Sequence, residues 1–352
     1  MRTALFIHSI LAMLLCACAG LTPGPPAGDP TLRLMDTLRA HARTHAPVCS
    51  PAVALLQPGG GIDLERLRAA GHPVIVWTVN DVPTMQALLR RGVDGIISDR
   101  PDLLMQAVRD FDANGDGTPG DLLDADGLID PKRFDAQGHR GARNLRPENT
   151  LPAFEAALDH RMTTLELDTV LTADGVPVLS HDPDLSPTKC RHTDGSPLRA
   201  PVPIAALTVE ELQATFVCDQ LLQDRPDQTN DRARSPEAVA FAARAGLPDP
   251  YTVPTLRQVF AFAADQADAT HEARDPLRAR NARRVRFNVE LKRASAKTDV
   301  APTHGDAVAR VIQEAGLARR VDVQSFDLRA VRSMQDRHPE LRAVLLLERA
   351  AE

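Results

Sequence analysis

Hydrophobic and polar positions along the chain follow two patterns, one typical of strands and one typical of helices, which together predict an α/β fold. Short apolar runs rich in β-branched residues, typical of buried parallel strands, alternate with segments whose apolar residues recur at helical spacing. The clearest predicted strand is HPVIVWTVND at residues 72–81, and Gly92 closes the predicted helix that follows over residues 83–91. Strands and helices that alternate through short connections indicate a parallel sheet covered by helices.

The other predicted elements continue this alternation. Further strands are predicted over residues 47–50, 95–99, 164–172, 177–182, 286–292, 321–326 and 343–347, and leading into His139. Further helices are predicted over residues 31–46, 63–70, 101–109, 151–158, 208–214, 236–245 and 255–268. Because a parallel crossover needs about a dozen residues, the strands at 164–172 and 177–182 must form a hairpin. Residues 183–282 are predicted to be a long, irregular insertion.

An acidic, glycine-rich stretch within residues 108–133 interrupts the alternation and is predicted to be a linker. Asp112, Asn114 and Asp116 match the first half of a calcium-binding loop. The closing position of such a loop holds Leu123 instead of an acid. A solvated linker is therefore the favoured interpretation, and a calcium loop is the alternative.

Composition and charge exclude several classes of protein. With 352 residues, 43% apolar and 25% charged, the chain can bury a large core as two domains or one barrel with extra segments. The net charge is −6, so no nucleic-acid-binding face is expected. Aromatic residues make up 3% of the chain, too few for a platform that stacks sugars or bases.

The N-terminal pattern predicts export. A basic start and a short apolar run make residues 1–17 a predicted signal peptide, because the run is too short to span a membrane. The sequence LCAC that ends at Cys18 resembles the bacterial lipoprotein box, which implies cleavage before Cys18 and a lipid on its sulfur. The alanine that follows implies an outer-membrane lipoprotein of the cell envelope, facing the periplasm, with residues 18–30 as its tether. Plain secretion is the alternative.

Three of the five cysteines lie beyond the predicted signal and anchor. An exported protein can keep disulfides. Cys190 and Cys218 lie in the same predicted insertion, so we expect them to pair and Cys49 to stay free. The spacings do not indicate a zinc site.

Charged residues gather where the predicted strands end. Residues two apart on a strand point to the same face, so Glu166 projects with Asp168. Glu290 projects with Lys292 for the same reason. Unpaired charges are costly to bury, and a hard cation would relieve that cost. The three carboxylates therefore predict a site for one divalent cation, Mg²⁺ or Ca²⁺, at the carboxyl ends of the strands.

Two histidines and two basic residues in the same segments suit phosphoryl chemistry. His139 and His181 titrate near neutrality, so one can accept a proton while the other donates one. Arg140 and Lys292 can hold an anion. Together with a cation, these groups point to hydrolysis directed at a phosphate.

Several of these residues have a structural alternative. Any single one of the eleven histidines is more often structural than catalytic. Asp182 is better explained as a turn former before Pro183 than as a ligand. Glu148 and Asn149 suit a helix N-cap and a supporting role at the site equally well.

These segments resemble the glycerophosphodiester phosphodiesterase family. The matching pieces are HRGARNLRPENTLPAFEAAL, ELDTVLTADGVPVLSHD, NVELK, VQSF, VIVWTVND and GVDGIISDRPD. The resemblance implies an α/β fold, a TIM barrel of the phospholipase C-like phosphodiesterase type with an inserted subdomain. It also implies cleavage of a glycerophosphodiester to sn-glycerol 3-phosphate and an alcohol. Similarity to the related phospholipases implies attack from the glycerol 2-hydroxyl, through a cyclic phosphate.

The resemblance assigns a role to each matching residue. It implies acid–base catalysis by His139 and His181, metal ligation by Glu166, Asp168 and Glu290, phosphate contacts from Arg140 and Lys292, and a pocket lined by Trp77 and Gln324.

The order of the pieces departs from the family, in which the HRG piece comes first and the WTVN piece comes near the end. Here WTVN occupies residues 77–80 and HRG occupies residues 139–141. We therefore predict a circular permutation. The predicted parts are strands six to eight at residues 31–107, the linker at 108–133, and strands one to five at 134–352 with the insertion at about 183–282. We expect a monomer whose barrel closes within one chain, with a domain-exchanged dimer as the alternative.

Three functions fit this sequence. The first is hydrolysis of a small glycerophosphodiester, with the lipid anchor as the protein's contact with a membrane. The second is a lysophospholipase D-type activity on intact lysolipids, which a wide apolar mouth to the pocket would favour. The third is a non-catalytic barrel that binds glycerophosphodiesters or is inactive.

Overall fold

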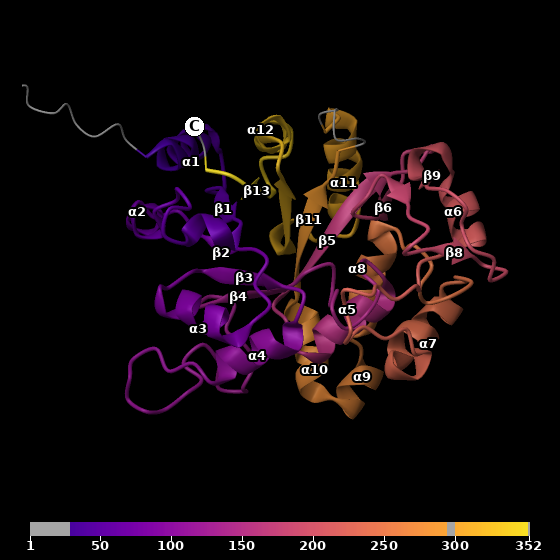
Figure 1. Ribbon diagram of the computed structural model, residues 1–352, viewed down its shortest axis with the longest axis horizontal. Coiled ribbons are helices and arrows are strands. Elements are labelled where there is room, and N and C mark those ends of the chain that lie inside the picture. Colours follow the sequence, from indigo (N-terminus) through magenta and orange to yellow (C-terminus); the bar gives the residue numbers. More distant parts are fainter. Residues whose placement is uncertain (1–28, 294–299, 351–352) are drawn as a thin grey trace, which may run out of the picture.

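The computed structural model describes residues 29–293 and 300–350. In this part of the chain, eight parallel strands form a barrel surrounded by helices (Figure 1). They are β1 Val48–Pro51, β2 Ile75–Val76, β3 Gly95–Ser98, β4 Asp135–Gly138, β5 Thr164–Leu171, β11 Arg286–Leu291, β12 Val321–Ser325 and β13 Arg342–Leu347. This architecture confirms the predicted α/β barrel. None of the helices described is both long and apolar enough to cross a membrane.

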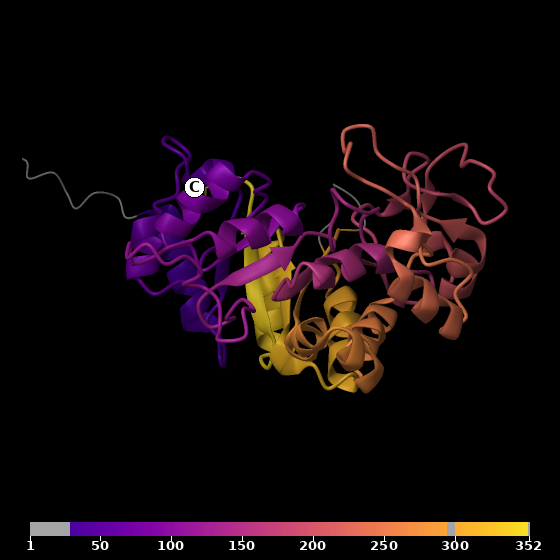
Figure 2. The same ribbon diagram turned by 90° about the horizontal axis from the view of Figure 1, so that it is seen from below.

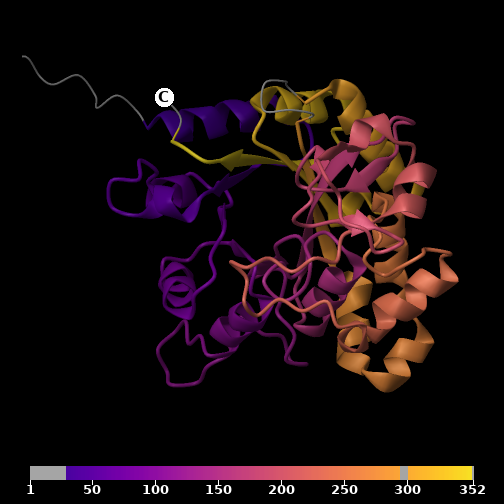
Figure 3. The same cartoon turned by 45° about the vertical axis from the view of Figure 1, so that its right-hand side comes forward.

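The barrel closes within one chain. Around the ring the strands follow the order β4, β5, β11, β12, β13, β1, β2 and β3. β3 pairs with β4 from Gly95 opposite Asp135, across the linker, and β13 pairs with β1. Bridges from Cys49 to Val74 and from Ala52 to Trp77 join β1 to β2. Segments from the two ends of the chain therefore lie side by side, as the yellow β13 and the indigo N-terminal elements show in Figure 3.

The helical layer is built from segments with one apolar face. Its helices before the insertion are α1 Pro30–His41, α2 Leu64–Ala69, α3 Val82–Arg90, α4 Pro101–Arg109 and α5 Leu151–Asp159. Those after it are α11 Pro302–Glu314 and α12 Leu328–Arg337, which the sequence analysis did not predict. Side chains on the outer face of the strands pack with these helices in one large core.

The inner face of the barrel is divided into a polar half and an apolar half. β5, β11 and β12 point Glu166, Asn288 and Gln324 inward, where the amide of Asn288 donates to Gln324 and the amide of Gln324 donates to Glu166. On the other side, β1, β2, β3 and β13 supply a small apolar cluster, Val48, Ile75, Ile97 and Val344. The polar network of Glu166, Asn288 and Gln324 therefore occupies one half of the ring interior.

An inserted lobe follows the β5–β6 hairpin (Figure 2), with β6 at Pro177–Leu179 antiparallel to β5, as predicted. The lobe contains β7 Asp184–Leu185, β8 Arg191–His192, β9 Val202–Pro203, α6 Val209–Thr215 and β10 Phe216–Val217. It has a small apolar core of its own, and a disulfide joins Cys190 to Cys218, the pair expected from the sequence. Cys49 is buried and free.

The second half of the predicted insertion belongs to the barrel. It forms α7 Pro236–Arg244, α8 Leu256–Asp265, α9 Ala269–Arg274 and α10 Pro276–Arg284. Residues of α7, α8 and α10 pack in the main core. α10 also holds the linker, because Arg284 pairs with Asp124 at 2.8 Å and Arg280 pairs with Asp126.

Candidate active site

Three buried carboxylates lie together at the carboxyl ends of two neighbouring strands. Glu166 and Asp168 come from β5, and Glu290 comes from β11, where it is paired in register with Asp168. Each side chain offers an oxygen within 4.8 Å of the others. The structure therefore brings together the three residues expected to hold a metal.

The environment of these carboxylates suits a divalent cation. Burial and the neighbouring charge of Asp168 raise the pKa values of Glu166 and Glu290. Burial alone would raise the pKa of Asp168 too, but Arg140 and Lys292 hold that pKa well below its usual range. Asp168 Oδ1 is buried and has no hydrogen-bond partner among the described residues. Three hard oxygen donors, among them a carboxylate oxygen that accepts no hydrogen bond, fit Mg²⁺ or Ca²⁺.

Two cations face this cluster. Arg140 follows β4 with a positive φ of 49°, and its backbone N–H donates to Glu166 while its guanidinium lies 3.2 Å from Asp168. The Lys292 ammonium lies 2.8 Å from Glu290 and 3.6 Å from Asp168. Both predicted phosphate-contacting residues are thus at the cluster, each paired with a carboxylate.

His139 is held by a residue that the sequence analysis did not assign to the site. Its Nδ1 lies 2.5 Å from Asp99 Oδ1, and its Nε2 lies 3.9 Å from Glu166. Burial alone would raise the pKa of Asp99, but the hydrogen bond to His139 and nearby positive charges keep that pKa low. Asp99 directly follows β3, so the position of an acid at the end of a barrel strand was the signal available.

His181 follows β6 and is one third exposed, and its charge helps to lower the pKa of Asp168. Its Nδ1 lies 2.8 Å from Asp182, and Lys189 of the inserted lobe binds the other oxygen of Asp182 at 2.7 Å. Asp182 thus orients a site histidine, whereas the sequence favoured a turn former.

Glu148 and Asn149 support the site and do not cap a helix. Thr150 is the N-cap residue of α5. Glu148 accepts from Arg140 at 3.0 Å and from Lys189 at 2.8 Å. The amide of Asn149 donates to Asp168 at 2.9 Å. Both residues therefore fix groups that surround the carboxylates.

The two residues expected to line the pocket are both at the barrel mouth, with different contacts. Gln324 donates to Glu166 at 2.7 Å and is fully buried, so it orients a carboxylate. Trp77 donates its indole N–H to the carbonyl of Ser50 and packs edge-on against Phe326, with ring centroids 5.4 Å apart.

The segment after the lobe also reaches the site through Arg225, a second residue that sequence reasoning missed. Its guanidinium lies 3.4 Å from Asp99 and donates to Asn144. Nothing in the local sequence around Arg225 indicates this contact, because it joins positions 126 residues apart.

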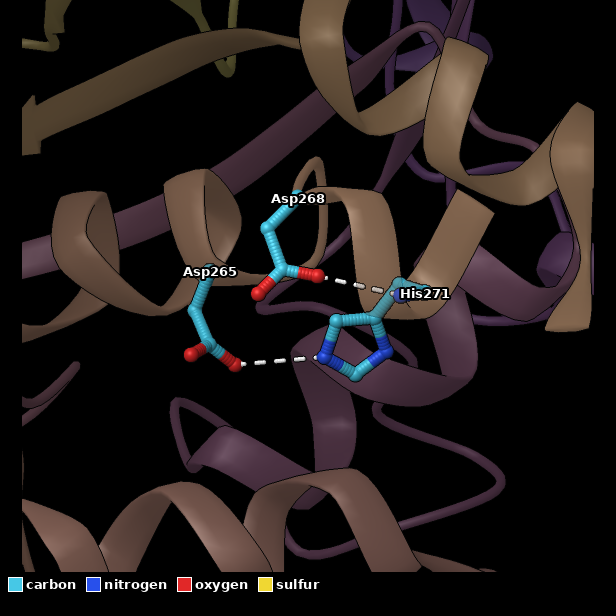
Figure 4. A group of neighbouring side chains, drawn as sticks. All are labelled: Asp265, Asp268 and His271. Atoms are coloured by element: carbon cyan, nitrogen blue, oxygen red, sulfur yellow. Dashed lines mark hydrogen bonds and ion pairs between the residues drawn. The ribbon is translucent and has the colours of Figure 1, made fainter. Parts of the chain in front are cut away.

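A second group of metal-ligand types, Asp265, Asp268 and His271, lies at the helices α8 and α9 (Figure 4). The Asp265 carboxylate accepts two hydrogen bonds from Arg244, and Asp268 caps α9 by accepting from the backbone N–H of His271. These carboxylates already have partners, so the group is explained by helix packing and capping.

Comparison with known proteins places these features in one family. The model of the glycerophosphoryl diester phosphodiesterase family matches residues 28–103 and 139–352. Rat glycerophosphodiester phosphodiesterase 1 is 47% identical over 64 residues, which are 18% of this chain and 18% of that protein. The aligned part thus spans less than a fifth of this curated relative.

Two solved structures resemble the chain more distantly. A glycerophosphodiester phosphodiesterase from Agrobacterium tumefaciens is 22% identical, with a TM-score of 0.36 over 58% of this chain and 63% of that chain. A phosphodiesterase from Oleispira antarctica, solved in complex with sn-glycerol-3-phosphate, is 20% identical, with a TM-score of 0.38 over 59% and 63%.

Proposed function

Because this chain belongs to the glycerophosphoryl diester phosphodiesterase family, we propose that it hydrolyses glycerophosphodiesters to sn-glycerol 3-phosphate and an alcohol. One observation carries the proposal: a buried cluster of three carboxylates lies near two histidines, each held at Nδ1 by an aspartate. Such a site combines charge stabilisation with two groups that can move protons.

The two histidines have separate tasks in this proposal. Asp99 and Asp182 accept from the Nδ1–H groups, which leaves each Nε2 free to exchange a proton with the substrate. One histidine takes the proton of the glycerol 2-hydroxyl as its oxygen attacks phosphorus, and the other protonates the leaving alcohol oxygen as the phosphorus–oxygen bond to the alcohol breaks. Water then opens the cyclic phosphate that has formed, which gives sn-glycerol 3-phosphate.

Arg140 and Lys292 bind the phosphate oxygens in this proposal, since they are the cations at the carboxylate cluster. Glu166, Asp168 and Glu290 would hold one divalent cation, Mg²⁺ or Ca²⁺, which supplies charge stabilisation at the phosphate.

We also propose that the protein is an exported, lipid-anchored enzyme of the cell envelope. The support is the sequence pattern up to Cys18, which lies outside the described residues. Metabolic labelling with a radioactive fatty acid should label the wild-type protein and not Cys18→Ala.

Release of glycerol 3-phosphate from glycerophosphocholine tests the proposed activity. We expect release with Mg²⁺ or Ca²⁺ and none with EDTA. His139→Ala and Glu290→Ala should each lower kcat by about a hundredfold or more, because they remove a proton-transferring group and a cation ligand. His41→Ala, which changes an exposed histidine of α1, is the matched control.

Failure of a folded, monodisperse protein to release any product would overturn the proposal. Binding of glycerophosphocholine without turnover would then identify a non-catalytic binding barrel. Turnover that survives in His139→Ala would show that this histidine is not the catalytic group.

A further inference from the structure

Lys189 of the inserted lobe joins two carboxylates that support the candidate active site. Its ammonium lies 2.8 Å from Glu148 Oε1 and 2.7 Å from Asp182 Oδ2. The other oxygen of Asp182 accepts from His181 Nδ1, and Glu148 also accepts from the guanidinium of Arg140. One lysine side chain is therefore linked both to a site histidine and to a site arginine.

This contact compensates for the exposure of Asp182. The side chain of Asp182 is 42% exposed, so without a second partner it would exchange between His181 and water. Glu148 is buried, and two arginines hold it in addition to Lys189. Lys189 therefore ties a half-exposed carboxylate to a fixed one. A carboxylate that is held at both oxygens keeps its imidazole partner in one orientation.

The fold of the lobe fixes the main chain at Lys189. Its backbone N–H donates to the carbonyl of Ser186 at 3.0 Å, and its own carbonyl accepts from the backbone N–H of Gln220 at 3.1 Å. The next residue, Cys190, forms the disulfide with Cys218, and its carbonyl accepts from the side-chain amide of Gln220 at 2.6 Å. The lobe therefore presents this lysine to the site from a fixed main chain.

The cavity that these groups border is too small for a substrate. Glu148, His181, Asp182 and Lys189 all line a cavity of about 40 Å³ under the lobe. Sites that bind small molecules have volumes of about 300 Å³ or more. This cavity therefore does not take up the leaving alcohol, and the hydrogen bonds of the Lys189 ammonium go to the two carboxylates.

We propose that Lys189 is a positioning residue for the departure of the alcohol and acts on His181 through Asp182. This inference rests on the proposed phosphodiesterase activity and gives His181 the task of protonating the leaving oxygen. His181 suits that task because one third of its side chain is exposed, against 13% for His139. A protonated imidazole costs less free energy to hold where water reaches it.

The step that depends on this alignment is a proton transfer. The proton on His181 Nε2 passes to the alcohol oxygen as the bond from that oxygen to phosphorus breaks, and His181 becomes neutral. The glycerol 2-oxygen bonds to phosphorus in the same step. An imidazole turned away from the leaving oxygen would slow the departure of a poor leaving group and have little effect on a good one.

Two substrates that differ in their need for this proton test the proposal. The leaving group of glycerophosphoglycerol is an uncharged alkyl alcohol, which needs a proton, whereas the p-nitrophenyl ester of glycerol 3-phosphate releases a stable phenolate. Lys189→Met keeps the approximate length of the side chain and removes its charge. We expect the ratio of kcat/KM for glycerophosphoglycerol over the p-nitrophenyl ester to fall about tenfold.

The ratio distinguishes the proposed role from a folding defect, because inactive protein lowers both values of kcat/KM in the same proportion. A disturbance that reaches Arg140 through Glu148 also lowers both values, since the two substrates carry the same phosphate. Lys189→Arg keeps the charge and should restore most of the ratio. Lys132→Met removes an exposed lysine of the linker and should leave the ratio unchanged.

A double-mutant cycle tests the route through Asp182. Asp182→Ala should lower the ratio by itself, because it removes the carboxylate that holds His181. In the Asp182→Ala background, Lys189→Met should lower the ratio no further, since the two side chains act on the histidine in series.

The outcomes separate this inference from the proposed function. If wild type cleaves both substrates and Lys189→Met leaves their ratio unchanged, the inference fails and the phosphodiesterase stands. A fall in the Asp182→Ala background as large as in the wild-type background would also overturn the inference, because Lys189 would then act by another route. If the folded wild type cleaves neither substrate, the proposed function itself fails, and this inference fails with it.

Discussion

At the scale of single residues, the carboxylates beside the two histidines decide what those histidines can do. Asp99 is buried, and besides His139 it binds the amide of Asn80 at 2.9 Å and lies near Arg225. A carboxylate held on several sides keeps its charge and its direction, and it fixes the imidazole tautomer with Nδ1 protonated. Asp99 is therefore a positioning residue.

Replacing Asp99 with Asn tests this assignment. The amide can present a donor to Nδ1 and favour the wrong tautomer, so kcat should fall by about a hundredfold with little change in KM. Steady-state kinetics on glycerophosphocholine would measure both constants. Asp81→Asn is the control. Asp81 caps the N-terminus of α3, and Asn is an equally good N-cap residue, so this substitution should leave kcat unchanged. An unchanged kcat would remove Asp99 from the mechanism.

At the scale of helices and strands, a buried acid joins two helices of the outer layer. Glu155 of α5 is 2% exposed and accepts the backbone N–H groups of Glu237 and Ala238 in the first turn of α7, at 3.2 and 2.7 Å. Burial raises the pKa of Glu155 to about 7. The folded protein therefore holds this proton at pH values where the unfolded chain has lost it.

This shift predicts a pH dependence of stability. Between the ordinary pKa of 4.5 and about 7, the folded state binds more protons, so the free energy of unfolding should fall as pH rises and level off above 7. The contribution is roughly 3 kcal/mol. Urea unfolding at about pH 5 and about pH 8 should show this difference in wild type and lose it in Glu155→Gln. Glu210→Gln, an exposed acid of α6, should leave the pH dependence as in wild type.

At the scale of the whole molecule, the strands follow one another around the ring in chain order, and the first and last strands, β1 and β13, are neighbours. β3 and β4 are neighbours in the ring, yet the linker separates them in sequence. The yellow segment after β13 runs beside α1 in Figure 1, and Leu34 and Ala350 line one groove with a volume of about 600 Å³. Neighbouring chain ends are what a circular permutation of the family's barrel requires, and the permutation itself stays a prediction.

A rearranged chain would test the permutation. Residues 134–352 followed by a flexible connection and residues 31–107 should refold to the same barrel, because ring contacts depend on neighbours in space. We expect the thermal transition to stay cooperative and kcat to lie within about tenfold of wild type. An aggregated or unfolded product would show that the linker and the existing chain order are needed. Light scattering on the existing chain should give a monomer.

The sequence by itself determined the positions of the barrel strands and the chemical groups that face inward from them. Residues two apart on a strand share a face whatever the partner strands are, so Glu166 with Asp168 and Glu290 with Lys292 could be grouped from spacing alone. The hairpin at β5–β6 followed from the short connection, and the pair Cys190–Cys218 followed from the insertion. These features depend on local geometry.

The tertiary structure alone decided contacts between distant segments. Asp99 meets His139 from a strand that lies before the linker, and Arg225 reaches Asp99 from beyond the lobe. The sequence also did not determine the length of β2. The strand was predicted over residues 72–81, but β2 has two residues, and Trp77 follows it at the mouth of the barrel. The groove lined by Leu34 of α1 and Leu346 of β13 also forms only when these elements, from opposite ends of the chain, become neighbours. Spacing along a chain carries no information about such contacts, since ring closure and packing set them.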